Sequence, residues 1–224
     1  MSEPAENDKH VVEQGEYTSG IAAQHGFPSH KGIWNDPGNA DLKKRRENPN
    51  ILLPGDELVI PKIELGSESR ASEARHPFTL GAEKLKLRLK LLDEVSSPIK
   101  DVSCRLRAEQ THEDLKTDGE GKVEMRIPRV SREGRVVVDA PDVSLKLDAG
   151  IGIGELNPID TSSGQIGRLN NLGYNAGDLG TKPTDEGYTQ FVSAIEEFQC
   201  DHGLKVDGLC GPQTRSKLKE VHGC

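Results

Sequence analysis

The chain has 224 residues, long enough for one large domain or for two to three small ones, and its 33% hydrophobic and 4% aromatic content predicts small cores. A formal net charge of −8 and a pI near 5.4 disfavour nucleic acid and anionic membranes as partners. The sequence contains no hydrophobic run long enough to span a bilayer, so insertion into a membrane is not expected.

The first 62 residues predict a short lead-in followed by one compact unit. Residues 1–9 are polar and acidic without periodicity, so we expect a flexible N-terminus there. From residue 10 the pattern predicts a strand, a turn, a helix capped by Thr18 or Ser19 and ended by Gly26, a second helical piece and a closing strand. Strand, helix, helix, strand is a compact βααβ unit.

This unit, residues 10–61, resembles the LysM fold, a carbohydrate-binding module that grips the N-acetylglucosamine backbones of peptidoglycan and chitin. The residues that carry the resemblance are Val11-Val12, Gly15, Ile21-Ala22, Phe27, Asn35, Asn50, Leu53-Pro54-Gly55 and Leu58-Val59-Ile60-Pro61. In that family the sugar lies between the loop after the first strand and the loop before the second. The ligand-binding residues that the resemblance implies are Gly15, Glu16, Tyr17 and Thr18 in one loop, and Asn50, Ile51, Leu52 and Leu53 in the other.

The N-terminal unit departs from the LysM pattern in two places. Glu16 stands where aspartate is usual, and residues 37–48 form a charged insertion. If the unit binds glycan, Tyr17 is expected to pack on a pyranose face and Asn50 to donate or accept hydrogen bonds. The alternative is a LysM scaffold that docks on protein rather than on sugar, because resemblance in fold does not decide what is bound.

A different pattern follows the first unit. Residues 63–77 are predicted to be a linker, because the stretch 66–74 is rich in Ser and Glu. Residues 83–91 then alternate strictly between leucine and charged residues, which predicts a half-buried antiparallel strand. We expect its basic stripe to be a solvated face that discourages association between sheets, with a polyanion site as the less favoured alternative. The stripe consists of Lys84, Lys86, Arg88 and Lys90.

Residues 78–157 predict an antiparallel β-sandwich, because short strands and turn signals recur at regular intervals. The further strands are expected at 102–108, 122–127, 135–139 and 143–147. The pattern is similar to transthyretin-like or carboxypeptidase-regulatory-like domains, on Asp93, Pro98-Ile99, Cys104, Leu106, Thr117-Asp118-Gly119, Gly121, Val123 and Ile127-Pro128. Its Asp-Gly pairs lack the spacing of a calcium-binding EF-hand, so they predict turns.

The last 65 or so residues predict helix, turn and helix. One helical face carries Phe191, Ile195 and Phe198. Gly203 is expected to close this helix in the left-handed conformation, and Leu204 and Val206 to point back inward. Pro212 suits the first turn of a second helix, because a missing N–H is tolerated there. The buried side of that helix is expected to contain Leu218 and Val221.

This region, residues 160–224, resembles the small three-helix peptidoglycan-binding domain found as a cell-wall anchor on many hydrolases. The residues that carry the resemblance are Leu169, Leu172-Gly173-Tyr174, Phe198-Gln199, Gly203-Leu204, Asp207-Gly208, Gly211 and Thr214. The resemblance implies Tyr174 and Asp207 as ligand-binding residues. Where the family usually has a second Asp-Gly-x-x-Gly turn, this chain has residues 175–187. The family's ligand groove borders that loop, so affinity and ligand choice depend on it.

No catalytic pattern is present in the sequence. The seven histidines are dispersed, without a His-Glu-x-x-His motif, and no Gly-x-Ser-x-Gly elbow occurs. Cys104 falls inside a predicted strand and is expected to be a core residue. Glu196 and Glu197 are adjacent on a helix and diverge, whereas acid–base catalysis needs two groups that converge. We therefore expect a protein that is not an enzyme and needs no cofactor.

Three of the four cysteines crowd into the last 25 residues. Zinc is a minor alternative for the set Cys200, His202, Cys210, His222 and Cys224, but Cys-x-His is a poor match to zinc-ligand spacing, so no metal is expected. Cys210 and Cys224 flank a helix whose ends lie roughly 15 Å apart, beyond the ~7 Å limit for a bridge. Outside the reducing cytoplasm we expect one disulfide that involves Cys200, preferably with Cys210.

Taken together, the sequence predicts a multidomain α+β protein with a LysM-like module at 10–62, a β-sandwich at 78–157 and a peptidoglycan-binding three-helix bundle at 158–224. The expected function is non-catalytic binding of peptidoglycan, with glycan and stem peptide recognised by two modules that gain avidity in one chain. The alternative is a docking, adaptor or cargo component of a contractile injection apparatus, with spike or baseplate proteins as partners. Without a recognisable signal peptide, we expect synthesis in the cytoplasm and delivery to the periplasm, cell wall or extracellular space by a specialised secretion system.

Overall fold

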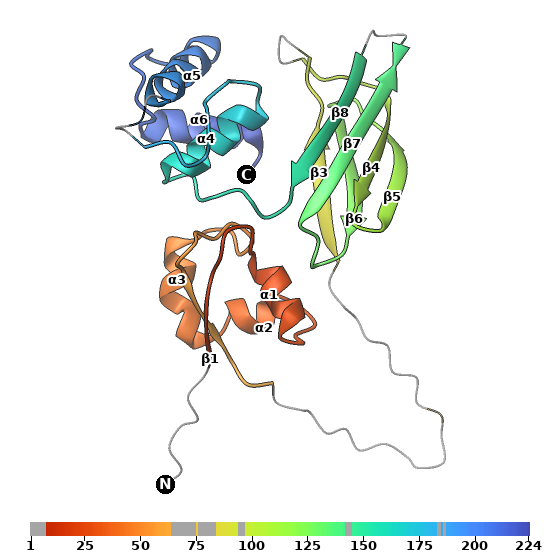
Figure 1. Ribbon diagram of the computed structural model, residues 1–224, viewed down its shortest axis with the longest axis vertical. Coiled ribbons are helices and arrows are strands. Elements are labelled where there is room, and N and C mark those ends of the chain that lie inside the picture. Colours follow the sequence, from red (N-terminus) through yellow and green to blue (C-terminus); the bar gives the residue numbers. More distant parts are fainter. Residues whose placement is uncertain are drawn as a thin grey trace. The chain divides into compact units, whose positions relative to one another are not determined.

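The computed structural model describes residues 8–63, 75, 84–93, 97–141, 145–182, 185 and 187–224 (Figure 1). Its contacts divide the chain into two compact units, residues 1–50 with 55–154, and residues 51–54 with 155–224. The protein is a mixed α+β structure with several antiparallel sheets and six α-helices among the described residues, as the sequence predicts. The predicted linker at 63–77 lies outside the described residues except for Ile63 and Arg75.

The N-terminal part of the first unit pairs β1 (Asp8–Val11) with β2 (Glu57–Ile60) in antiparallel register. Between these strands lie α1 (Thr18–Gln24), α2 (Lys31–Trp34), the 3-10 helix η1 (Pro37–Asn39) and α3 (Ala40–Arg45). The predicted strands and first two helices are therefore present. The flexible N-terminus was predicted two residues too long, because Asp8 and Lys9 already pair with β2; residues 1–7 lie outside the described residues.

The start of α1 differs from the prediction. Tyr17 is the N-cap, with extended backbone and no capping hydrogen bond from its side chain. The Thr18 hydroxyl donates instead to the carbonyl oxygen of Pro49 at 2.5 Å. The helix ends before Gly26, whose φ of +78° is the left-handed conformation that glycine adopts at low cost.

The charged insertion at 37–48 is a folded part of the first unit. The Asn39 amide nitrogen donates to the carbonyl oxygens of Ile33 and Val59 at 2.9 and 2.8 Å, and its oxygen accepts from the Val59 N–H at 2.7 Å. Asn39 thus pairs with β2 as a neighbouring strand would. Arg46 and Asp56 form a buried two-point ion pair at 2.8 and 3.1 Å, the geometry in which arginine and carboxylate bind most strongly.

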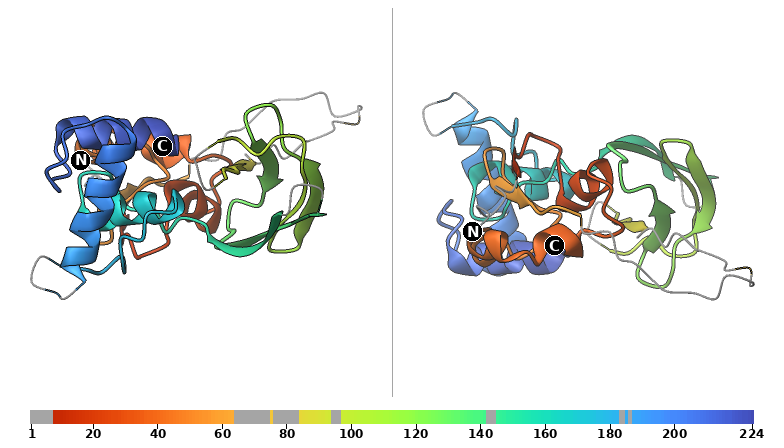
Figure 2. Two further views of the ribbon diagram at one scale, coloured as in Figure 1. Left: turned by 90° about the horizontal axis from the view of Figure 1, so that it is seen from above. Right: turned by 90° about the horizontal axis from the view of Figure 1, so that it is seen from below.

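The strands of the first unit that follow residue 84 form two antiparallel sheets in the described part of the chain (Figure 2). One pairs β3 (Leu85–Lys90) with β6 (Lys122–Ile127). The other has the order β5 (Thr111–Lys116), β4 (Ser103–Ala108), β7 (Glu133–Ala140) and β8 (Leu145–Gly152). Alternate residues of both sheets point into one hydrophobic core, in which Leu106, Met125 and Val138 are almost fully buried. Cys104 belongs to this core, as predicted.

The alternation of apolar residues predicted this region well where the strands are half-buried, but the polar edge strand β5 was missed. Its sequence is Thr-His-Glu-Asp-Leu-Lys, and it pairs with β4 over its full length. Strand β8 extends to Gly152, so residues 151–152 belong to the sheet and not to the connection into the last domain. The first residues of the predicted strand 143–147 lie outside the described part of the chain.

The second unit contains α4 (Ser162–Asn171), α5 (Tyr188–Asp201) and α6 (Pro212–His222). Its core includes the predicted residues Phe191, Ile195, Phe198 and Leu218. The prediction for Val206 is wrong, because this side chain is 52% exposed. Over the described residues, none of the helices combines the length and the apolar character that a membrane crossing requires.

The Asn39 contacts generate a prediction for the N-terminal part. Replacing this buried side chain in Asn39→Ala leaves the N–H and the carbonyl oxygen of Val59 without their Asn39 partners, so we expect a loss of roughly 1–3 kcal/mol in the free energy of unfolding. The Ile33 carbonyl oxygen loses one bond but still accepts from the Asp36 N–H at 3.0 Å. Urea denaturation measures the change. The matched control is Asn35→Ala, an exposed asparagine whose amide oxygen accepts from the Lys43 ammonium at 2.7 Å and whose loss should change stability by less than about 0.5 kcal/mol. Equal losses in the two variants would contradict the role of Asn39.

Candidate ligand-binding site

The connection between α5 and α6 is held by the amide of Gln199, which is 1% exposed. Its oxygen accepts from the N–H groups of Asp207 and Gly208 at 2.9 and 3.1 Å. Its nitrogen lies 3.0 Å from an oxygen of Asp207, 3.0 Å from the Leu209 carbonyl and 3.1 Å from the Thr214 hydroxyl. One buried side chain therefore fixes the whole turn. The fixed turn presents Val206 and Leu209 to solvent, 52% and 66% exposed.

Both residues that the sequence implied for ligand binding in this domain have structural partners. Asp207 accepts hydrogen bonds from Gln199 and from the Leu209 N–H, and these bonds hold its pKa below the usual range. Tyr174 donates to the Asp201 carboxylate at 2.9 Å and packs edge-on against Phe198; burial and that carboxylate raise its pKa. Asp207 is exposed and Tyr174 half-buried, so their role in ligand binding stays a prediction.

An open hollow lies beside the loop between α4 and α5. Its volume is about 580 Å³, in the range of small-ligand sites. The described residues that line it include Asn175, Asp178, Thr181, Asp185 and Gln190. Side chains and glycine backbone thus offer carboxylates, amides and a hydroxyl to a ligand. The sequence singled out this loop as a departure but did not name these residues; its run of Asn, Asp, Gly and Thr was the available signal.

The rim of this hollow is fixed by Asn170, the last but one residue of α4. Its amide nitrogen donates to the Gly177 carbonyl oxygen at 2.8 Å, and its amide oxygen accepts from the Ala176 N–H at 2.8 Å. Ala176 is fully buried in the core of the unit. The loop therefore starts from a rigid attachment to the helix. A second open hollow of about 580 Å³ lies along α6 and is lined by Leu204, Pro212, Gln213, Ser216, Lys217 and Glu220.

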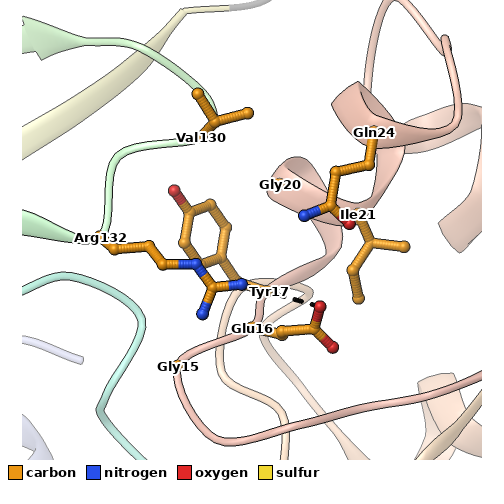
Figure 3. A pocket seen from close by; sticks show the side chains of 8 residues that line it. All are labelled: Gly15, Glu16, Tyr17, Gly20, Ile21, Gln24, Val130 and Arg132. Carbon is orange, nitrogen blue, oxygen red and sulfur yellow. Dashed lines mark ion pairs between the residues drawn. The ribbon is translucent and has the colours of Figure 1, made fainter.

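In the first unit, the loop implied for sugar binding is buried. Tyr17 is 4% exposed, and its hydroxyl donates to the Ser131 carbonyl oxygen at 2.7 Å. Its side chain lies near those of Val130 and Arg132 (Figure 3). Burial raises its pKa to about 12. The prediction that the Tyr17 ring packs on a sugar is therefore wrong for this structure, because the loop between β6 and β7 covers it. Thr18 is also fully buried, and Gly15 is buried.

Glu16 lies next to Tyr17 and lines the same small cavity. Burial would raise the pKa of its carboxyl, but the Glu13 N–H, His10 at 2.6 Å and the Arg132 guanidinium at 3.8 Å together lower it (Figure 3). The cavity that Glu16, Tyr17 and Arg132 help to line measures about 20 Å³. This volume holds about one water molecule and not a pyranose ring.

The second implied sugar loop also has structural contacts. The Asn50 amide oxygen accepts from the Ser19 N–H at 3.1 Å, which ties this loop to the start of α1. Leu52 is buried, while Ile51 and Leu53 are half-buried. Asn50 is half-buried as well, so its direct contact with a glycan stays a prediction.

The cysteines of the last helical unit are thiols in this structure. Cys200 is exposed on α5, whereas Cys210 packs against the core and burial raises its pKa to about 11. The Cys200–Cys210 bridge is thus absent here and stays a prediction for the oxidised protein. Within the described residues no three His, Cys, Asp or Glu side chains gather closely enough to hold a metal ion.

Cys224 forms a separate contact with His222. Its sulfur lies 3.2 Å from Nδ1 of His222, while Nε2 of the same ring lies 3.1 Å from the Asn171 amide nitrogen. Burial, together with the nearby Arg168, lowers the pKa of His222 to about 4, and burial raises the pKa of the Cys224 thiol. The pair is therefore a neutral thiol beside a neutral imidazole, whereas a cysteine nucleophile acts as the thiolate.

The second unit has the architecture of a small three-helix binding domain with an open polar hollow. Within it, residues 167–218 match a family described as a putative peptidoglycan binding domain. The chain thus carries a C-terminal peptidoglycan-binding helical domain, as the resemblance implied. No curated protein and no solved structure matches the chain.

The Gln199 contacts generate a prediction for this domain. In Gln199→Ala the buried N–H groups of Asp207 and Gly208 lose their acceptor, so we expect the free energy of unfolding of the domain to fall by roughly 2–4 kcal/mol. Denaturant unfolding, monitored by hydrogen exchange of the backbone amides in α5 and α6, measures this loss. Gln213→Ala, an exposed glutamine on α6, is the control and should leave stability within about 0.5 kcal/mol. A similar effect of both changes would contradict the assignment.

The half-buried His222 generates a prediction of pH dependence. Its pKa is about 4 in the folded protein against an ordinary 6.5, so folding favours the neutral ring. The stabilisation is present above pH 6.5 and is lost as the pH falls from 6.5 towards 4, by about 1–3 kcal/mol. Thermal unfolding of the C-terminal domain at several pH values should show this decline, and His222→Gln should flatten it. The control His112→Gln, on exposed β5, should leave the pH profile of that domain unchanged.

Proposed function

We propose that the protein binds peptidoglycan without catalysing a reaction, and that the hollow bordered by Asn175, Asp178 and Gln190 receives the stem peptide. The observation that carries this proposal is the coincidence of two features in one domain. Residues 167–218 match the peptidoglycan-binding family, and the open hollow lies beside the loop next to which the family's groove is expected.

The chemistry of the hollow suits a stem peptide. Such a peptide offers backbone amides, carboxylates and, in uncrosslinked chains, a side-chain ammonium group. The carboxylates of Asp178 and Asp185 can pair with an ammonium group, and the amides of Asn175 and Gln190 can hydrogen-bond to peptide groups. All four side chains are exposed, so a stem peptide can reach them without a rearrangement of the core.

For the N-terminal module we propose docking on protein, the alternative that the LysM resemblance left open. Two contacts within the first unit support this choice. The Tyr17 hydroxyl donates to the Ser131 carbonyl oxygen, and the Arg129 guanidinium donates to the Phe27 carbonyl oxygen at 2.7 Å. A glycan bound between the two loops would have to displace the first contact. On this proposal the sandwich-like β part serves as the docking partner within the same chain.

Co-sedimentation with insoluble sacculi tests the proposed function. The full chain should pellet with sacculi, and the double variant Asp178→Ala/Gln190→Ala should remain mostly in the supernatant, because two polar contacts with the ligand are lost. A reduction of about tenfold or more in affinity is expected, corresponding to roughly 1.4 kcal/mol or more.

The second hollow supplies the matched control. The double variant Gln213→Ala/Ser216→Ala changes two exposed polar residues that line the hollow along α6 and should bind sacculi as the unchanged protein does. Circular dichroism should show the same helical content for all three proteins. If the full chain stays in the supernatant at every salt concentration, the proposed function is wrong. If the α6 variant alone loses binding, the ligand occupies the other hollow.

A further inference from the structure

The two sheets of the first unit carry very different charges on their solvent faces. The face of the β3–β6 sheet has six basic residues and one acidic residue: Lys84, Lys86, Arg88, Lys90, Lys122 and Arg126, with Glu124 among them. We call this the basic face. The solvent face of the four-stranded sheet has five basic residues, Arg105, Arg107, Lys116, Arg135 and Lys146, against Asp114, Glu133, Asp139 and Asp148.

Strand register places like charges opposite each other on the basic face. Lys86 lies opposite Arg126, and Lys90 lies opposite Lys122. Opposed like charges destabilise an antiparallel pair, so these residues work against the stability of the sheet. The sequence pattern alone showed one basic stripe on one strand. The register adds a second basic strand beside it, so positive charge covers both strands of this two-stranded sheet.

Glu124 and Glu120 neutralise only part of this charge. Glu124 pairs with both Lys86 and Arg88, at 2.5 and 2.7 Å, and its pKa is lowered by hydrogen bonds from these two cations. Glu120, in the preceding turn, pairs with Lys122. Among the described residues no ion pair is formed by Lys84, Lys90 or Arg126. The face therefore keeps a clear excess of positive charge.

On the four-stranded sheet, basic residues are paired with separate carboxylates. Arg105 lies opposite Asp114 and pairs with it at 2.7 Å. Arg135 donates two hydrogen bonds to Asp148, at 2.6 and 2.7 Å, and Lys116 pairs with Asp101 at 3.3 Å. Three of its five cations thus have a carboxylate of their own. Among the described residues, the basic face thus has six cations with one carboxylate, whereas the other solvent face has five cations with four carboxylates.

We propose that the basic face of β3 and β6 is a binding site for a linear anionic polymer whose charges are phosphodiester groups joined by polyols. Residues on one face of a strand recur about every 6.7 Å, and adjacent strands lie about 4.8 Å apart. The cations therefore form two parallel rows into which a chain with one charge every 6–7 Å fits. None of the described residues on this face is aromatic, and single-stranded nucleic acids are usually bound with aromatic stacking platforms.

The net charge of −8 does not prevent such binding. At 0.15 M salt the Debye length is about 8 Å, so a ligand that lies on the basic face experiences chiefly the cations beneath it. The more distant acidic residues are screened. Binding of this kind releases counterions from the polymer, and it must therefore weaken steadily as the salt concentration rises.

Titration of the full chain with a defined poly(glycerol phosphate) oligomer tests the site. The double variant Lys90→Gln/Arg126→Gln removes two cations that form no ion pair with any described residue, and should weaken binding about tenfold or more at low salt. The slope of log K against log salt should fall in magnitude by about one for each cation removed. Its unfolding midpoint should stay the same or rise, because both changes relieve opposed like charges.

The control Arg105→Gln/Arg135→Gln makes the same change in net charge on the other sheet. It should leave affinity within twofold of the unchanged protein and should not raise the unfolding midpoint. The proposal is overturned if the oligomer does not bind, if both double variants weaken binding equally, or if single-stranded DNA of equal charge binds as tightly. The site lies outside the C-terminal domain, so loss of sacculus binding in the Asp178→Ala/Gln190→Ala variant does not affect this test.

Discussion

The C-terminal domain depends on one buried cation. Arg168 is 2% exposed on α4, and its guanidinium donates to the carbonyl oxygens of Asn157, Gly164 and Cys224 at 2.9, 2.8 and 2.8 Å. Burying a charge is costly unless its hydrogen bonds are satisfied, so these carbonyl oxygens must stay in place. Glycine is also required at position 164, for a steric reason: a Cβ there would overlap the Pro158 carbonyl oxygen. The incoming chain, the first helix and the end of the last helix are thereby fixed together.

The shape of the proposed stem-peptide hollow depends on this arrangement. With α4 fixed, Asn170 near its end holds the loop through Ala176 and Gly177. Further along the chain, the neutral amide of Gln199 fixes the α5–α6 turn. Two buried polar side chains, Arg168 and Gln199, thus decide where the backbone is rigid. The exposed residues between them in the sequence remain available for ligands. This division agrees with the general finding that binding residues lie on loops supported by a rigid scaffold.

Sequence patterns predicted those parts of the structure in which burial repeats along the chain. Strand β6 has the bounds that alternation predicted, and the apolar face of α5 forms the core of its domain. Predictions were wrong where a distant partner decides the outcome. Tyr17 is covered by a loop more than a hundred residues away, and β5 has one leucine and no clear alternation because its other side chains face water at the sheet edge. Val206 is exposed beside the turn that the amide of Gln199 holds, an arrangement that no local pattern reveals.

The role of Arg168 also bears on how this domain can be combined with others. Because one guanidinium contacts both Asn157 and Cys224, the chain enters and leaves the domain at nearly the same point. A module with adjacent ends can be inserted into a surface loop of another protein or attached at its terminus with little disturbance to either fold. In protein engineering, residues 155–224, which form the second unit apart from residues 51–54, are therefore a candidate cassette for transfer. The boundary to respect is the Asn157 carbonyl rather than the first turn of α4.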